Sequence, residues 1–235
     1  HVLTVTTPTY GNICDHGCAP CALSSLSADQ KPVHSLAFSC DGRRLMVKMD
    51  SEVEVHDIAT GELIRTYKGS ASVAFSPDGR RFTVGSWGLP ATVHEVEIPR
   101  SGCGPASSAC TIPLDECGDE EKVFTAYSPD GQLLAIAYGS NVAVYDTLRS
   151  EPMPSVALVN TIKYESEKEG EEAEEPRANS VAFSPDGQQL AVGWTETVAL
   201  HAVATGEVLQ RIVKGNGAVV AFSPDGRQLA VGRKT

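Results

Sequence analysis

One sequence segment recurs five times along the chain, and its clearest copy spans 180–193. Each copy holds an apolar run, a Ser-Pro-Asp-Gly turn (Ser-Cys-Asp-Gly in the first copy) and a second apolar run. Alternating apolar positions predict a strand, and Pro-Asp-Gly predicts a tight turn in which glycine adopts a positive φ. The sequence therefore predicts a repeat array of β-hairpins. An aromatic residue marks each copy: Phe38, Phe75, Tyr127, Phe183 and Phe222.

A third and a fourth strand follow the hairpin in the clearest copies. After the first hairpin, 52–57 alternates between polar and apolar residues, 59–62 has the turn sequence Ala-Thr-Gly-Glu, and 63–67 is a further strand candidate. Four antiparallel strands per repeat are typical of one blade of a β-propeller.

This order of motifs resembles the WD-repeat β-propellers, and the resemblance covers nearly the whole chain. The shared residues are Val-Ala-Phe-Ser-Pro-Asp-Gly, a third strand ending in Asp, Ala-Thr-Gly-Glu, and Lys-Gly before the next repeat. The resemblance implies an all-β propeller that acts as a non-catalytic scaffold for protein partners in a larger assembly. The chain departs from the family where Trp-Asp would end the third strand, with His56-Asp57, His94-Glu95, Tyr145-Asp146 and His201-Ala202.

We expect a single domain of five four-stranded blades, closed by its own ends. The chain stops after a second strand, and its first residues suit a third and a fourth strand, so the ends can pair and hide the strand edges of an open array. The alternative is a slice of a larger propeller. The expected blades span 34–68, 71–115, 122–164, 178–213, and 217–235 together with 1–29.

The formal net charge of −11 argues against nucleic acid as the main partner, since nucleic-acid-binding proteins display clustered Lys and Arg. Segment 165–175 holds seven Glu and one Lys. We expect it on the top face, which carries the turns between second and third strands; the Pro-Asp-Gly turns define the bottom face. Such a run is ordinarily a solvated loop, and it could also attract a basic partner. No apolar run of transmembrane length occurs, so we expect no membrane insertion.

The positions just after the second strands form the candidate partner site. The repeat register brings them to the top of successive blades, around the mouth of the central channel. Clustered aromatic rings anchor protein or sugar partners, so a small propeller lectin is an alternative to a protein platform. The other interpretation is that each ring caps the core of its own blade. The candidate residues are Met49, Trp87, Tyr138, Trp194 and Arg233. We expect a partner to dock across Trp194 and Tyr138, beside the acidic segment.

The seven cysteines lie almost entirely in expected loops. Disulfides suit this placement, and Cys103 and Cys110, which flank a short Gly/Ser/Pro loop, are the expected pair. Free thiols are another option, because an odd count leaves at least one unpaired. A disulfide would indicate an oxidising compartment and free thiols an intracellular one. Four residues could instead supply thiolates to zinc, although paired Cys-x-x-Cys knuckles are absent: Cys14, Cys18, Cys21 and Cys40. We expect no cofactor.

Three histidines occupy the same third-strand position in three blades: His56, His94 and His201. Because they belong to separate blades, we expect them to pack between blades and not to converge on a metal. A phosphate-binding glycine loop, G-x-S-x-G, H-E-x-x-H and the kinase signatures are all absent. The sequence therefore gives no positive support for catalysis.

Overall fold

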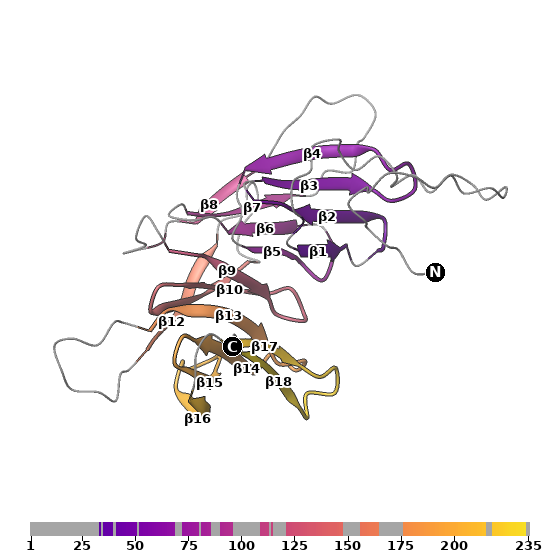
Figure 1. Cartoon of the computed structure of the whole chain (residues 1–235). Coiled ribbons are helices and arrows are strands. Elements are labelled where there is room, and N and C mark those ends of the chain that lie inside the picture. The colour runs from indigo at the N-terminus through magenta and orange to yellow at the C-terminus, as the bar shows by residue number, and fades with distance from the viewer. Residues whose placement is uncertain are drawn as a thin grey trace.

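The computed structural model describes residues 33, 35–39, 41–50, 52–68, 72–79, 81–85, 90–95, 109–112, 114, 121–147, 156–164, 176–214 and 218–233. Within these residues the regular secondary structure consists of strands β1 to β18 (Figure 1). No helix in this described part is long and apolar enough to cross a membrane.

The strands form four antiparallel four-stranded sheets and one two-stranded sheet, each built in chain order. Blade one contains β1 (Ser35–Phe38), β2 (Arg44–Lys48), β3 (Glu52–Asp57) and β4 (Leu63–Lys68). Blade two contains β5 (Ser72–Phe75), β6 (Arg81–Gly85), β7 (Ala91–Glu95) and β8 (Ala109–Ile112). Blade three contains β9 (Phe124–Tyr127), β10 (Leu133–Tyr138), β11 (Asn141–Asp146) and β12 (Ala157–Lys163). Blade four contains β13 (Ala178–Phe183), β14 (Gln189–Trp194), β15 (Thr197–Ala202) and β16 (Val208–Lys214), and the last sheet contains β17 (Ala218–Phe222) and β18 (Leu229–Arg233).

The repeated hairpin turns share one hydrogen-bond pattern. In blade four, the Ser184 hydroxyl donates to Asp186 Oδ1 (2.5 Å) and accepts the N–H of Gln189 (2.9 Å). Gly187 has φ +71°, and its N–H donates to the Ser184 carbonyl (2.9 Å). The same serine–aspartate bond recurs in the other four hairpins. Each turn therefore has a local cause in its Ser-x-Asp-Gly sequence.

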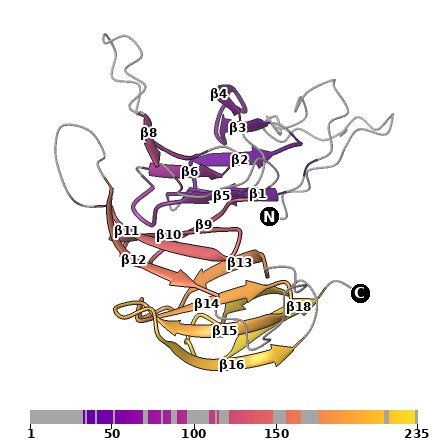
Figure 2. The ribbon, with the colours of Figure 1, turned by 90° about the vertical axis from the view of Figure 1, so that its left-hand side faces the viewer.

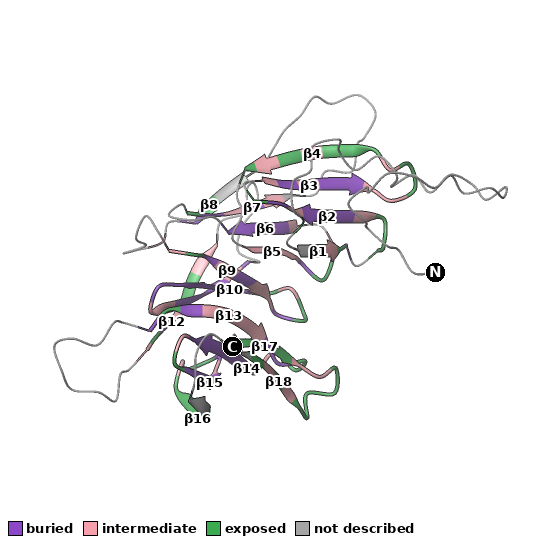
Figure 3. Ribbon diagram, viewed as in Figure 1, coloured by how far each residue is buried: buried purple, intermediate pink, exposed green. Residues whose placement is uncertain are grey.

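The sheets follow one another in chain order, from blade one to the β17–β18 sheet (Figures 1 and 2). Their first strands contact each other in the series β1, β5, β9, β13 and β17. The fourth strands β4, β12 and β16 lie on the outside and carry many exposed residues, whereas the second and third strands are mostly buried (Figure 3). This is the all-β, four-stranded-blade architecture that the sequence predicts, and it is confirmed.

The hydrophobic core lies between the blades. One cluster joins Val142 and Val144 of blade three to Leu190, Val192 and Trp194 of blade four. The three residues of blade four lie on its second strand, β14, at intervals of two positions. They therefore share one face of the sheet, and this face is turned toward the preceding blade. Each blade is thus stabilised mainly by its neighbours, as expected for a repeat protein.

Blade one carries the same apolar face on its own second strand. Leu45, Val47 and Met49 are buried there, and the partly buried Ile58 packs against them. Residues 1–29, which the sequence predicts to complete the last blade, lie outside the described residues. Closure of the ring and a count of five blades therefore stay predictions.

Candidate functional site

The expected top-face anchors lie in the core between blades. Trp194 ends β14 with 1 % of its surface exposed, and Tyr138 ends β10 with 5 % exposed. The Trp194 ring meets the Tyr164 ring edge-on, with centroids 5.4 Å apart. Met49 is also buried. The structure favours the interpretation that these side chains pack within the core.

The reason for this burial is the alternation of the second strand, which places Leu190, Val192 and Trp194 on one face. The same alternation places Leu134, Ile136 and Tyr138 on one face of β10. Trp87 lies outside the described residues, and the side chain of Arg233, at the end of β18, is not described. A partner contact at this set of residues stays a prediction.

The three third-strand histidines remain on separate blades. His94 stacks on Phe82 (centroids 5.1 Å apart) and contacts the Tyr67 ring of blade one (4.5 Å). Burial, together with the positive charge of Arg65, lowers the pKa of His94 to about 4. His94 is therefore neutral near pH 7 and packs between blades one and two.

The other two histidines are almost fully buried. His56 Nε2 lies 2.9 Å from Glu54 Oε2 on the same strand. His201 Nδ1 lies 3.1 Å from the Gly206 carbonyl oxygen and acts as the donor, because a carbonyl can only accept. Burial lowers the pKa of His201. Within the described residues, no group of three or more His, Cys, Asp or Glu side chains could hold a metal ion.

The predicted cysteine sites and the acidic segment fall largely outside the described residues. Cys110 lies on β8, where it pairs with Val93 of β7, but its side chain is not described. The disulfide between Cys103 and Cys110, the alternative zinc site and the position of 165–175 therefore stay predictions. The remaining candidate thiol residues, also outside the described ranges, are Cys14, Cys18, Cys21 and Cys40.

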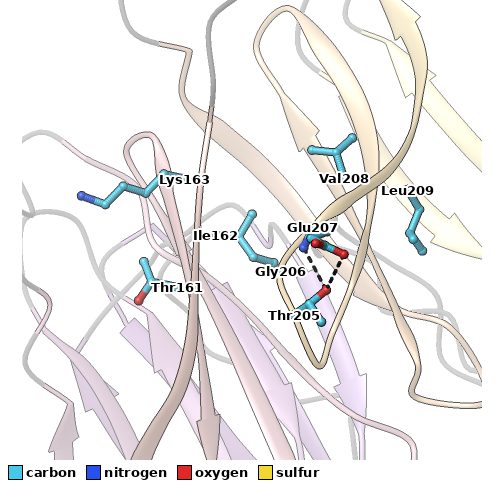
Figure 4. Close-up of a pocket in the computed structure, with 8 residues that line it drawn as sticks. All are labelled: Thr161, Ile162, Lys163, Thr205, Gly206, Glu207, Val208 and Leu209. Atoms are coloured by element: carbon cyan, nitrogen blue, oxygen red, sulfur yellow. Dashed lines mark hydrogen bonds between the residues drawn. The ribbon is translucent and has the colours of Figure 1, made fainter.

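An open groove of about 590 Å³ lies between the outer edges of blades three and four (Figure 4). We call it the β12–β16 groove. One wall is β12 from Thr161 to Lys163, and the other is the β15–β16 turn and the start of β16, from Thr205 to Leu209. Val208 and Leu209 are 41 % and 53 % exposed, while Ile162 is buried at the base of the β12 wall. The groove therefore offers apolar surface to solvent.

Contacts between the two blades hold the β15–β16 turn in place. Asn160 of β12 donates from Nδ2 to the Val203 carbonyl (3.4 Å), and its amide lies against Gly206, which has φ +76°. His201 donates to the carbonyl of the same glycine. Beyond the other end of 161–163, the Arg211 guanidinium lies over the Tyr164 ring, 5.6 Å from its centroid. The groove thus lies between two inter-blade bridges, which favours a preformed site.

Two charged residues line the groove, Lys163 and Glu207. The Thr205 hydroxyl donates to Glu207 Oε2 (3.3 Å). Figure 4 shows the Lys163 side chain directed away from Ile162 and from Glu207. The groove combines exposed apolar side chains with threonine hydroxyls and a carboxylate, and this mixture is complementary to a segment that carries both apolar side chains and a cation.

Sequence reasoning missed this groove, although a repeated signal was present. In three blades an exposed apolar pair lies at or near the start of the outer strand, and each residue of these pairs is 41–57 % exposed. The pairs are Leu63-Ile64, Leu158-Val159 and Val208-Leu209. Adjacent apolar residues on an edge strand cannot both face the core, so such a pair marks exposed apolar surface.

Comparison with known proteins identifies the repeat and the fold. The family model for the WD domain, G-beta repeat, matches residues 61–88. Among curated proteins, no sequence matches the chain. Among solved structures, the chain is similar to the crystal structure of the Cps50 (Swd1) β-propeller domain of Myceliophteria thermophila.

That similarity has a TM-score of 0.65 at 15 % sequence identity and covers 86 % of this chain. The matched part spans 62 % of the Swd1 chain, less than two thirds of its length. At this identity the similarity concerns the fold, and 1086 solved chains match in the same search. The chain therefore carries a WD repeat at residues 61–88 and has the fold of the WD-repeat β-propellers.

Proposed function

We propose that this protein is a non-catalytic interaction platform that binds a protein partner through the β12–β16 groove. The observation that supports this proposal most strongly is the groove itself, which lies between two blades and is lined by the exposed residues Val208 and Leu209. Apolar side chains that become buried in a complex are a main source of its affinity. The WD-repeat propeller fold supports the proposal, because propellers of this family mostly act as scaffolds in larger assemblies.

The proposed partner is basic at its contact surface. The chain has a net charge of −11, and Glu207 places a carboxylate in the groove. Segment 165–175 follows Tyr164 directly in sequence, so its negative charge is tethered to the end of β12. A field of this sign speeds the encounter with a basic protein, while apolar burial supplies most of the affinity.

The groove replaces the channel mouth as the proposed contact. Trp194 and Tyr138 have too little exposed surface to act as anchors without opening the core. The same burial removes the stacking surface that a sugar-binding role would need from these two rings. A lectin function would therefore depend on Trp87.

Cross-linking of the full-length protein in its native extract, followed by mass spectrometry, tests the platform proposal. We expect one partner to be recovered in a constant ratio to this chain, with cross-links that map to Lys163 and Lys214 at the ends of β12 and β16. A protein that remains monomeric and uncross-linked in its native extract would contradict an interaction role.

A further inference from the structure

Among the described strands, β12 is the outer edge of the blade-three sheet and pairs with β11 alone. The Tyr164 N–H donates to the Ser140 carbonyl (3.0 Å), so the backbone of residue 164 is directed toward the β10–β11 hairpin. Successive residues of an antiparallel strand direct their N–H and C=O groups to opposite sides. The backbone groups of Lys163 and Thr161 therefore point away from β11.

One of these outward groups already has a partner. The Thr161 N–H donates to the Asn160 side-chain Oδ1 (2.8 Å). The Thr161 carbonyl and the N–H and carbonyl of Lys163 remain directed to the outer side of the sheet. In antiparallel pairing, a single residue opposite Lys163 exchanges two hydrogen bonds with it, and the residue two positions along donates to the Thr161 carbonyl. The edge thus presents the donor and acceptors that a short added strand needs.

The second wall of the groove supplies contacts for side chains of such a strand. Val208 and Leu209 of blade four are exposed beside this edge, and Glu207 stands next to them (Figure 4). The side chains of a strand alternate between two faces, so every second residue of an added segment would face this wall. Apolar residues there would contact Val208 and Leu209, and a Lys or Arg would pair with Glu207.

We propose that the partner binds by strand addition: an extended segment with alternating apolar and basic residues pairs with β12 and becomes the fifth strand of blade three. This inference rests on the proposed function and specifies its binding mode. Main-chain hydrogen bonds to Lys163 and Thr161 fix the register of the added strand. The blade-four wall of the groove determines which side chains of that strand are favoured.

The decisive variant is Lys163→Pro. Proline removes the outward N–H and blocks pairing at this edge, and it is tolerated on an edge strand where that N–H faces solvent. Lys68→Pro is the matched control, because Lys68 pairs with the first residue of β3 as Lys163 pairs with the first residue of β11. Leu209→Ser, at an exposed position, tests the groove wall independently and does not alter the β12 backbone.

The probe is a displayed library of random peptides about eight residues long, the length of an ordinary strand. It is selected on the full chain, and the best peptide is titrated against each variant. We expect alternating apolar and basic sequences, a loss of affinity of at least about tenfold for Lys163→Pro and for Leu209→Ser, and parent affinity for Lys68→Pro. A copy of the peptide that is N-methylated on the residues pairing with β12 should fail to bind.

Strand addition is overturned if no peptide is enriched, if the N-methylated copy binds as well as its parent, or if Lys163→Pro keeps full affinity despite a parent-like melting temperature. Self-association of the chain through this edge, seen as a dimer that Lys163→Pro dissolves, would also overturn it, because the occupant would then be a second copy. A native partner whose cross-links map away from β12 would overturn strand addition and leave the platform function intact.

Discussion

Asn160 of blade three lies directly against Gly206 of blade four: a Cβ added at residue 206 would come within 2.8 Å of the Asn160 amide nitrogen. Gly206 also has φ +76°, a backbone region that residues with a Cβ rarely adopt. This contact joins the turn of blade four to the outer strand of blade three, at the groove where we place partner binding.

Gly206→Ala should destabilise the protein by two separate effects. The left-handed backbone costs about 1–2 kcal/mol for a residue with a Cβ, and crowding against Asn160 adds to it. Gly42→Ala is the matched control, because Gly42 has φ +66° and nothing within 4 Å of the added Cβ. Denaturant unfolding should show the larger loss for Gly206→Ala, and the added substitution Asn160→Ala should remove the excess. Equal losses for Gly206→Ala and Gly42→Ala would show that the inter-blade contact is not tight.

Trp194→Ala should lower the free energy of unfolding by about 3–5 kcal/mol, because it leaves a cavity between blades three and four. The ring is 1 % exposed, so its loss should act on the fold first and on partner affinity only through the fold. Calorimetry on Trp194→Ala and on the exposed-site variant Leu209→Ser distinguishes the two roles. A Trp194→Ala protein with unchanged melting and strongly weakened partner binding would restore the channel mouth as the binding site.

Stability should fall as the pH drops from about 6.5 to about 4, in part because of His94. Its pKa in the folded protein is lowered to about 4, so in this range the unfolded chain binds a proton at His94 that the folded protein does not. His94→Phe keeps a ring beside Phe82 and Tyr67 and removes the titration. Its melting temperature should depend less on pH than that of the parent, and an identical pH profile would contradict the assignment.

The fold could be predicted from the sequence because its causes are local. Each Ser-x-Asp-Gly turn is closed by its own side chains, as in Ser184 and Asp186, and the alternation of the flanking residues marks the strands. How far a side chain is buried depends on how the neighbouring blade packs against it, and the sequence of a single repeat does not determine that packing. For this reason the sequence leaves two interpretations of Trp194 open, a partner anchor and a core residue, although its spacing of two from Val192 favours the core face.

The groove could not be predicted for a related reason. Ile162 of one repeat and Val208 of the next line its two walls. The relative position of these outer strands depends on how the blades pack. Only the exposed apolar pairs after the turns, such as Val208-Leu209, carried a local signal. The same limit applies to ring closure, which depends on 1–29.

Neutralising the acidic segment should slow partner association without a large change in dissociation. The variant replaces Glu171, Glu172, Glu174 and Glu175 with Gln, which removes a long-range attraction for a basic partner. Stopped-flow or surface-plasmon measurements over a range of salt should show a slower association rate with a flatter salt dependence. Leu209→Ser should show the opposite split, with dissociation accelerated. An association rate that is equally salt-dependent before and after neutralisation would refute the role of this segment.

The most direct measurement compares the affinity of the purified partner for two matched variants, Leu209→Ser and Ile64→Ser. The two residues hold the same position, second in the outer strand, and are similarly exposed at 53 % and 47 %, but only Leu209 lines the β12–β16 groove. Binding through this groove predicts at least about a tenfold loss of affinity for Leu209→Ser and parent affinity for Ile64→Ser. Parent affinity for Leu209→Ser, or an equal loss for both variants, would contradict it.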